Sequence, residues 1–151
     1  MQFLIFHLGK DRYGLSTRHL VRILPLMGVK QLPQAPPYVA GLINWHSTPV
    51  PVIDLVALTC KMSCSAQFDT RILLTEFCAD DGTTHWLGLM VERVSHLENI
   101  DPSLFSTSGV SNADAPYLGK VTATDGLLLQ LIELEHVLPA EVRRLLFQPG
   151  A

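Results

Sequence analysis

Apolar residues occur in short segments along this chain, and polar turns separate those segments. Some segments alternate between apolar and polar positions, whereas others are apolar throughout. Runs of about four to eight such residues, bounded by glycine, proline, asparagine or aspartate, are typical of β-strands. The pattern therefore predicts a mainly β fold, with strands at residues 2–8, 13–15, 21–24, 39–45, 50–55, 70–78, 86–94, 96–100, 117–124 and 127–134.

The segment at residues 39–55 is predicted to form the central hairpin of the fold. Gly41, inside its first strand, predicts a β-bulge or the close approach of another backbone. Pro49 and Pro51 lack amide hydrogens on the same edge of the returning strand, so we expect one side of that strand to be unpaired or bulged. Residues 44–48 form the predicted turn at the tip of the hairpin.

Helical signals are few and short. Ser16 or Thr17 is the predicted cap of one helical turn at 17–20. Pro139 is predicted at the first position of a C-terminal helix whose apolar residues share one face. Because the rhythm of strand and turn at 3–24 is similar to that at 72–97, the sequence also suggests two similar β units, as two small barrels or sheets that share a core.

Composition and charge limit the possible functions. The chain has 151 residues, 48% hydrophobic and 17% charged, which is enough for one domain with a well-filled core. Its net charge is −3 and it has no run of lysine or arginine, which argues against binding nucleic acid. We also expect no membrane insertion, because no signal peptide and no stretch approaching about 18 apolar residues is present. Three scattered cysteines are typical of a reducing cytosol and predict a cytoplasmic protein.

Two groupings of polar residues could carry chemistry, and each is incomplete. Cys60 and Cys64 could supply half of a metal site, but no second pair of ligands follows. His46, Ser47 and Asp54 are the residue types of a catalytic triad, yet no nucleophile elbow or oxyanion loop accompanies them. We therefore interpret them as turn residues and a strand-end carboxylate. No phosphate-binding or dinucleotide-binding loop is present either, so we expect no catalytic residue, no cofactor and no metal.

The two tryptophans are the largest side chains near these turns. Trp45 lies at the predicted hairpin tip, where an aromatic ring either folds back onto the core or anchors a partner. Core packing is slightly favoured for Trp45 on the sequence alone. Trp86 begins a later strand and is predicted to lie in the core.

The central segment resembles the CheW-type coupling proteins of bacterial chemosensory arrays. Members of that family carry Pro-x-x-Pro-x-Tyr-Val-x-Gly-(Ile/Val)-Ile-Asn-Leu-Arg-Gly-x-(Ile/Val)-(Ile/Val)-Pro-Val-(Ile/Val)-Asp-Leu. The residues in step with this pattern are Pro33, Pro36, Tyr38, Val39, Gly41, Ile43, Asn44, Pro51, Val52, Ile53, Asp54 and Leu55. Weaker matches to the family's opening hairpin, Gly-Leu-Val-Val-Asp-x-Val strand and closing hairpin occur at 3–15, 88–94 and 125–134, so the resemblance covers nearly the whole chain.

This resemblance implies a non-catalytic adaptor made of two intertwined five-stranded SH3-like β-barrels with short helices and a C-terminal helix. It implies one domain over residues 1–151, with one barrel at 14–66 and the other at 67–135 plus the N-terminal strand. The implied partners are the regulatory domain of a CheA-type histidine kinase and the cytoplasmic tip of a chemoreceptor, in membrane-associated receptor arrays. Partner contacts are expected at Val39, Gly41, Ile43, Asn44, Trp45, His46, Ser47, Pro51, Asp54 and Leu55.

The chain departs from the family pattern at the hairpin tip, where Leu-Arg-Gly is replaced by Trp45, His46 and Ser47. A neutral histidine cannot hold a carboxylate with the forked hydrogen bonds of arginine. Ser47 lacks the freedom of glycine at positive φ, so we expect a tip of different shape. Pro49 stands where a β-branched residue is usual. These differences predict a divergent adaptor of an alternative chemosensory pathway, whose choice of partner would be relaxed by His46→Arg and Ser47→Gly.

A second hypothesis stays open, because a fold does not determine a function. The scaffold could serve as a small-ligand-binding or enzymatic β-barrel protein. A deep polar pocket that holds a carboxylate or histidine of altered pKa would favour that alternative. Shallow grooves and apolar strand edges would favour the adaptor.

Overall fold

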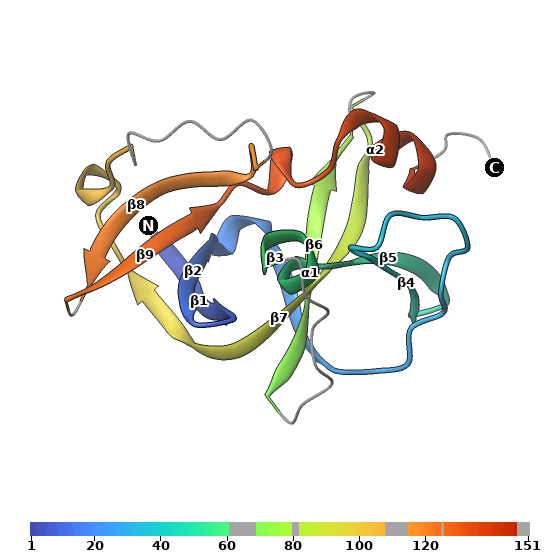
Figure 1. Ribbon diagram of the computed structural model, residues 1–151, viewed down its shortest axis with the longest axis horizontal. Coiled ribbons are helices and arrows are strands. Elements are labelled where there is room, and N and C mark those ends of the chain that lie inside the picture. Colours follow the sequence, from blue (N-terminus) through green and yellow to red (C-terminus); the bar gives the residue numbers. More distant parts are fainter. Residues whose placement is uncertain (61–68, 80–81, 108–114, 125, 148–151) are drawn as a thin grey trace.

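The computed structural model describes residues 1–60, 69–79, 82–107, 115–124 and 126–147. Nine strands and two α-helices, together with three short 3₁₀ turns, make up this part of the chain (Figure 1). The strands are β1 Gln2–Leu8, β2 Asp11–Ser16, β3 Leu20–Pro25, β4 Val39–Trp45, β5 Thr48–Asp54, β6 Thr70–Cys78, β7 Thr84–Asn99, β8 Leu118–Thr124 and β9 Leu127–Ile132. The helices are α1 Leu55–Cys60 and α2 Ala140–Leu146, and the 3₁₀ turns are η1 Thr17–His19, η2 Pro102–Leu104 and η3 Leu134–His136.

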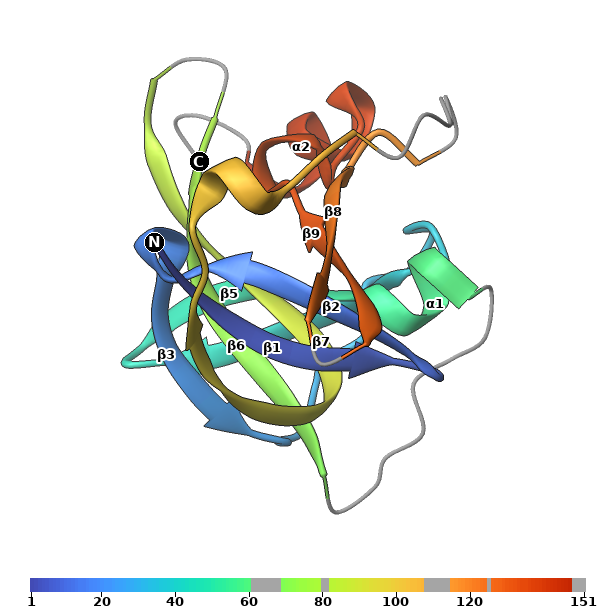
Figure 2. The same ribbon diagram turned by 90° about the vertical axis from the view of Figure 1, so that its left-hand side faces the viewer.

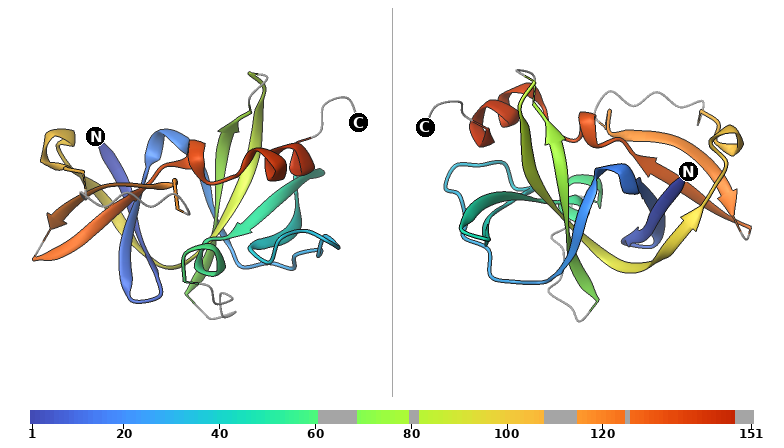
Figure 3. Two further views of the ribbon diagram at one scale, coloured as in Figure 1. Left: turned by 45° about the horizontal axis from the view of Figure 1, so that its top comes forward. Right: turned by 180° about the vertical axis from the view of Figure 1, so that it is seen from behind.

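The long strand β7 connects two groups of five strands. Its first half pairs with β6 and β5, and its second half pairs with β1. One group therefore contains β3, β6, β7, β5 and β4, and the other contains β7, β1, β2, β9 and β8. Figures 2 and 3 show the curved course of β7 between the groups from other sides. The prediction of a mainly β fold built from two five-stranded units is confirmed.

The barrels are open rather than closed rings of hydrogen-bonded strands. In the described residues, β3 pairs only with β6, β8 only with β9, and β4 only with β5. Two isolated bridges, Lys30 to Leu42 and Ser106 to Val121, extend the pairing at the edges. The subdivision into 14–66 and 67–135 stays a prediction, and strand pairing does not follow that boundary, because β6 pairs with the earlier strand β3.

Three clusters of buried apolar side chains follow from this arrangement. One cluster lies within the first group and includes Ile43, Val52 and Ile72, and a smaller one lies within the second group. The largest cluster packs between the groups. Strand β1 contributes Phe3 to the second-group cluster and Leu4 to the shared one, as expected for a strand that is apolar on both faces.

Both backbone predictions for the central hairpin are confirmed. The β4–β5 register shifts between Val39 and Gly41, which is a bulge, and Gly41 has φ +142°. A Cβ at Gly41 would overlap the carbonyl oxygen of Lys30, whose amide donates to the Leu42 oxygen at 2.8 Å. On the other edge, β5 pairs with β7 only over Val52–Asp54, so pairing begins after the two prolines.

Some local predictions were wrong by a few residues. The two segments predicted at 86–94 and 96–100 form the single strand β7, which continues through Arg93 at φ +46°. The helix α2 begins at Ala140, and Pro139 is its N-cap in extended geometry rather than its first helical residue. The predicted helical turn after Ser16 is confirmed, because the Ser16 side chain accepts a hydrogen bond from the Arg18 amide.

Candidate functional site

The tip of the β4–β5 hairpin is a two-residue turn. Trp45 pairs with Thr48, and the two residues between them, His46 and Ser47, have φ values of +49° and +65°. The predicted turn over 44–48 was therefore too long. The expectation that Ser47 would avoid positive φ was also wrong, because Ser47 adopts the left-handed conformation that a glycine adopts at no steric cost.

A stack of three side chains, two from this hairpin and one from strand β3, is the most distinctive feature near this tip. The rings of Trp45 and His46 stack with centroids 4.2 Å apart and planes 17° apart. The guanidinium carbon of Arg22, from β3, lies 5.6 Å from the Trp45 ring centroid. Arg22 and His46 are exposed, whereas Trp45 is half-buried and packs against the first-group core cluster. Trp45 thus combines core packing with an accessible ring.

The ten residues expected to contact a partner divide by burial. Six of them are buried: Val39, Gly41, Ile43, Pro51, Asp54 and Leu55. Their side of the hairpin holds the fold together, so direct contact with a partner is left to the accessible stretch Asn44–Ser47.

Asp54 has a structural role at the other end of β5. Its carboxylate accepts a hydrogen bond from the Ala57 amide at 3.0 Å, which is the geometry of a helix N-cap for α1. The length of β5 separates Asp54 from His46 and Ser47, so these residues do not form a triad. Among the described residues no group of three or more His, Cys, Asp or Glu side chains could hold a metal ion. Cys64 lies outside the described residues.

A cleft of about 320 Å³ opens next to the tip. Pro49 and Pro51 form part of one wall and Trp86 part of another, while Phe147 closes one side. The prolines cannot donate hydrogen bonds to β7, which explains why the strands separate here. Phe147 stacks on His85 with ring centroids 4.6 Å apart, and Trp86 packs partly against the first-group core as predicted.

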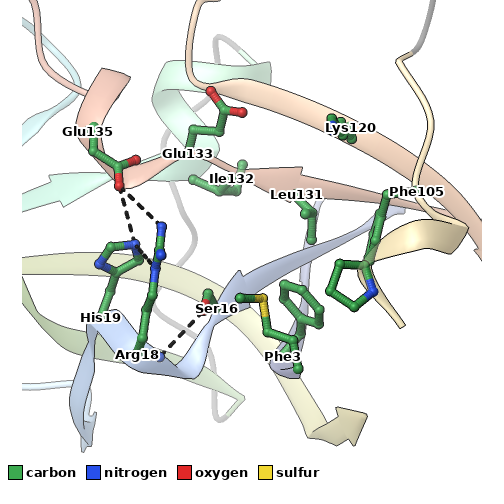
Figure 4. A pocket seen from close by; sticks show the side chains of 12 residues that line it. Phe3, Ser16, Arg18, His19, Phe105, Lys120, Leu131, Ile132, Glu133 and Glu135 are labelled. Carbon is green, nitrogen blue, oxygen red and sulfur yellow. Dashed lines mark hydrogen bonds and ion pairs between the residues drawn. The ribbon is translucent and has the colours of Figure 1, made fainter. Parts of the chain in front are cut away.

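A second cavity, of about 250 Å³, lies in the other strand group (Figure 4). Phe3 and Phe105 meet edge to face in its apolar part, with centroids 5.3 Å apart. At its other end Arg18 and His19 approach the Glu135 carboxylate at 3.7 and 3.4 Å. Burial lowers the pKa of His19 because it penalises the charged imidazolium, and the nearby Glu135 opposes this effect. Arg18, His19 and Glu135 thus interact with one another at this end of the cavity.

Arg22 is the residue of the tip that sequence reasoning missed. A signal was available, because Arg22 lies two positions before Leu24 and so shares its face of the strand. Leu24 is buried in the first-group core, so an arginine at position 22 has to lie at the edge of that core, where an aromatic ring can cover it. Contact with a tryptophan on a strand that does not pair with β3, however, requires the tertiary fold.

Among the described residues no helix is long and apolar enough to cross a membrane.

Comparison with known proteins agrees with this architecture. A solved structure, the scaffolding protein TtCheW from Thermoanaerobacter tengcongensis, superposes with a TM-score of 0.78 at 23% identity, covering 89% of this chain and 84% of that one.

Sequence relatives span nearly the whole chain. The chemotaxis protein CheW of Klebsiella aerogenes is 24% identical over 146 residues, covering 93% of this chain and 82% of that protein. The chemotaxis protein CheW of Rhizobium meliloti is 23% identical over 144 residues, covering 94% and 90%. The CheW-like domain family matches residues 2–142. The chain therefore belongs to the CheW-like domain family.

Proposed function

We propose that this protein is a non-catalytic adaptor that couples chemoreceptors to a CheA-type histidine kinase in a bacterial chemosensory complex. The observation that carries the proposal is the match of the CheW-like domain family to residues 2–142. The names of the relatives, chemotaxis protein and scaffolding protein, support it. The adaptor would act in the cytoplasm, at membrane-associated receptor arrays.

The proposed contact surface is the accessible stretch Asn44–Ser47 of the hairpin tip, backed by the six buried residues of the predicted set. Its proposed partners are the kinase regulatory domain and the receptor's cytoplasmic tip. Several features support recognition of a protein rather than turnover of a substrate. The tip presents an aromatic stack on a short turn, next to an open cleft lined by Pro49 and Trp86, and exposed aromatic anchors beside grooves are typical of protein interfaces.

The replacement of the family's Leu-Arg-Gly by Trp45, His46 and Ser47 supports a divergent adaptor with its own cognate partners. Specificity is a difference between affinities, and a changed contact alters it even where the scaffold is kept. The double change of His46→Arg and Ser47→Gly should then increase binding to a non-cognate kinase. Equal binding before and after the change would contradict this part of the proposal.

Titration of the purified protein against two fragments tests the proposal. The fragments are the regulatory domain of the co-encoded histidine kinase and a receptor tip, each followed by calorimetry. Saturable binding of both, with micromolar-range affinity, is the expected result. His46→Ala should weaken one of them, whereas His96→Ala, which removes an exposed histidine from the far half of β7, should weaken neither.

The other outcomes are equally informative. Binding of one fragment alone would indicate a competitor of array assembly rather than a coupling protein. Binding of neither by a folded protein would overturn the adaptor proposal in favour of a small-ligand-binding protein.

A further inference from the structure

We propose that Arg22, Trp45 and His46 form a carboxylate-binding platform that accepts a glutamate or aspartate side chain of the protein partner. The inference rests on the proposed adaptor function, and it specifies the chemistry that the tip recognises. These three residues form the stack platform.

The hydrogen-bond donors of the stack platform are not used within the described part of the chain. Arg22 makes no hydrogen bond or ion pair with any described residue, and the His46 ring makes no hydrogen bond with one. A guanidinium carries five N–H groups in one plane and binds a carboxylate with two parallel hydrogen bonds. Its weak hydration lets it lie on an aromatic face while those N–H groups stay available at the rim.

Stacking also orders the site before a partner binds. Trp45 is half-buried against the first-group core, so its ring is fixed by packing. With Arg22 at 5.6 Å from the ring centroid and His46 at 4.2 Å, both polar side chains are held against a fixed surface. Less conformational entropy is then lost when an acidic side chain binds than with a free arginine.

The local charge also favours an acidic ligand. The protein has a formal net charge of −3, yet residues 39–53, which form almost all of the β4–β5 hairpin, include no Asp, Glu, Lys or Arg. Arg22 is the only charged residue of β3. The first carboxylate after the tip is that of Asp54, which is buried and caps α1. On the adjacent strand β6, the exposed Glu76 lies two positions from Leu74, the partner of Arg22, but it forms no ion pair with Arg22. Arg22 thus supplies a positive charge beside an otherwise uncharged hairpin, and this charge complements an acidic side chain of a partner.

This placement also explains how the tip functions without the arginine of the family pattern. Position 46 holds histidine here, and the guanidinium is supplied instead by the neighbouring strand β3, over the tryptophan that replaces the family's leucine. In this proposal the recognised group is a carboxylate held by a guanidinium from β3, so its position on the partner would differ from that suited to an arginine at position 46. A partner matched to an arginine at position 46 therefore fits this tip poorly.

A titration with a small probe tests the platform without any partner. The probe is N-acetyl-L-glutamate amide, and N-acetyl-L-glutamine amide is its neutral isostere. In NMR spectra we expect the glutamate compound to shift the Arg22 Nε–H and Trp45 Nε1–H signals in a saturable way at millimolar concentrations, whereas the glutamine compound should not. Arg22→Gln should abolish the Trp45 shift, and Arg144→Gln, which removes an exposed arginine from α2, should preserve it. Equal shifts with both compounds, or an unchanged Trp45 shift in Arg22→Gln, would overturn the proposal.

Binding to the two protein fragments then separates the platform from the adaptor function. Arg22→Glu should raise the Kd for one fragment on the order of tenfold, with a weaker salt dependence, as expected when an interfacial charge is reversed. Arg144→Glu, with the same charge change, should alter neither Kd by more than about twofold. An acidic-to-lysine change in that fragment should restore binding to Arg22→Glu.

The outcomes distinguish the two proposals. Normal binding by Arg22→Glu would overturn the platform and leave the adaptor intact. Binding of neither fragment by the unaltered protein would overturn the adaptor, and the probe titration would then decide on the platform by itself.

Discussion

The two strand groups each present a hairpin with an arginine beside its turn, and the two arginines are used in opposite ways. At the β8–β9 turn, the Arg12 Nη2 atom donates to the Thr124 carbonyl at 2.8 Å, to the Thr124 hydroxyl at 2.7 Å and to the Leu127 carbonyl at 3.0 Å. At the β4–β5 turn, Arg22 lies over Trp45 and makes no hydrogen bond or ion pair with a described residue.

The two turns also differ in the kind of side chains that they expose. Next to the Arg12 hydrogen bonds, Leu127 and Leu128 are 58% and 72% exposed, so that hairpin presents apolar surface. The β4–β5 turn instead presents a cation, an imidazole and an aromatic ring. A guanidinium that donates from Nη2 to the backbone of a turn, as Arg12 does, stabilises the fold, whereas one that makes no hydrogen bond within the described residues is available to a partner. Sequence position alone does not tell these two roles apart.

The largest effect is expected from a change at the base of the β4–β5 hairpin. Gly41→Ala would place a Cβ against the Lys30 carbonyl at a φ of +142°, so both overlap and backbone strain should destabilise the protein by about 3 kcal/mol or more. Urea unfolding measures this free energy. Gly28→Ala is the matched control, because no atom lies within 4 Å of its added Cβ and its φ is not in the left-handed region. A Gly41→Ala protein within about 1 kcal/mol of the unaltered one would contradict the bulge geometry.

The next largest effect on stability is expected when each of the two arginines is replaced by methionine. Arg12→Met should lower the free energy of unfolding by about 2 kcal/mol, because it removes the charge-assisted hydrogen bonds that the two N–H groups of Nη2 share among three acceptors and leaves two carbonyls without that donor. Arg22→Met should change it by less than about 0.5 kcal/mol, since only a partly exposed cation–π contact is lost. Equal losses in the two variants, measured by urea unfolding, would show that the contrast between the hairpins is not real.

The sequence predicted the features that depend on backbone constraints. Glycine inside a strand implies a bulge or close contact, and Gly41 has both. Prolines in a strand predict that backbone hydrogen bonds to a neighbouring strand are missing there, and the pairing of β5 with β7 begins after Pro51. These predictions succeeded because each constraint acts on the residue that carries it, whatever the rest of the fold does.

The sequence could not predict features that depend on distant parts of the chain. Ser47 adopts positive φ because strand pairing on both sides fixes the turn at two residues, which outweighs the local preference of serine. Arg22 and Trp45 belong to strands β3 and β4, which do not pair with each other, so their contact exists only in the folded chain. Burial of Pro51 and Leu55 likewise follows from packing against other strands. Matching a family pattern therefore identified the hairpin, but not which of its residues are accessible.

A smaller effect should separate the shape of the tip from its charge. Ser47→Gly should stabilise the protein by about 0.5–1 kcal/mol, because glycine adopts a φ of +65° without the steric cost that serine has. Ser95→Gly, in the exposed part of β7, should instead destabilise it by about 0.5 kcal/mol. Thermal unfolding measures both changes. If Ser47→Gly also leaves partner affinity unchanged, recognition depends on the side chains of the stack platform and not on the turn conformation.

The smallest effect concerns the cavity of the other strand group. Burial lowers the pKa of His19 below its value of about 6.5 in the unfolded chain. The unfolded state then binds the proton more readily, so the contribution of His19 to stability is fully present above about pH 6.5 and is lost as the pH falls towards the lower pKa of the folded state. In urea unfolding between pH 7.5 and about 5.5, His19→Gln should lose less stability than the unaltered protein. Glu135→Gln should lose more, because Glu135 raises the pKa of His19. Identical pH slopes in the three proteins would mean that His19 is as well solvated in the folded chain as in the unfolded one.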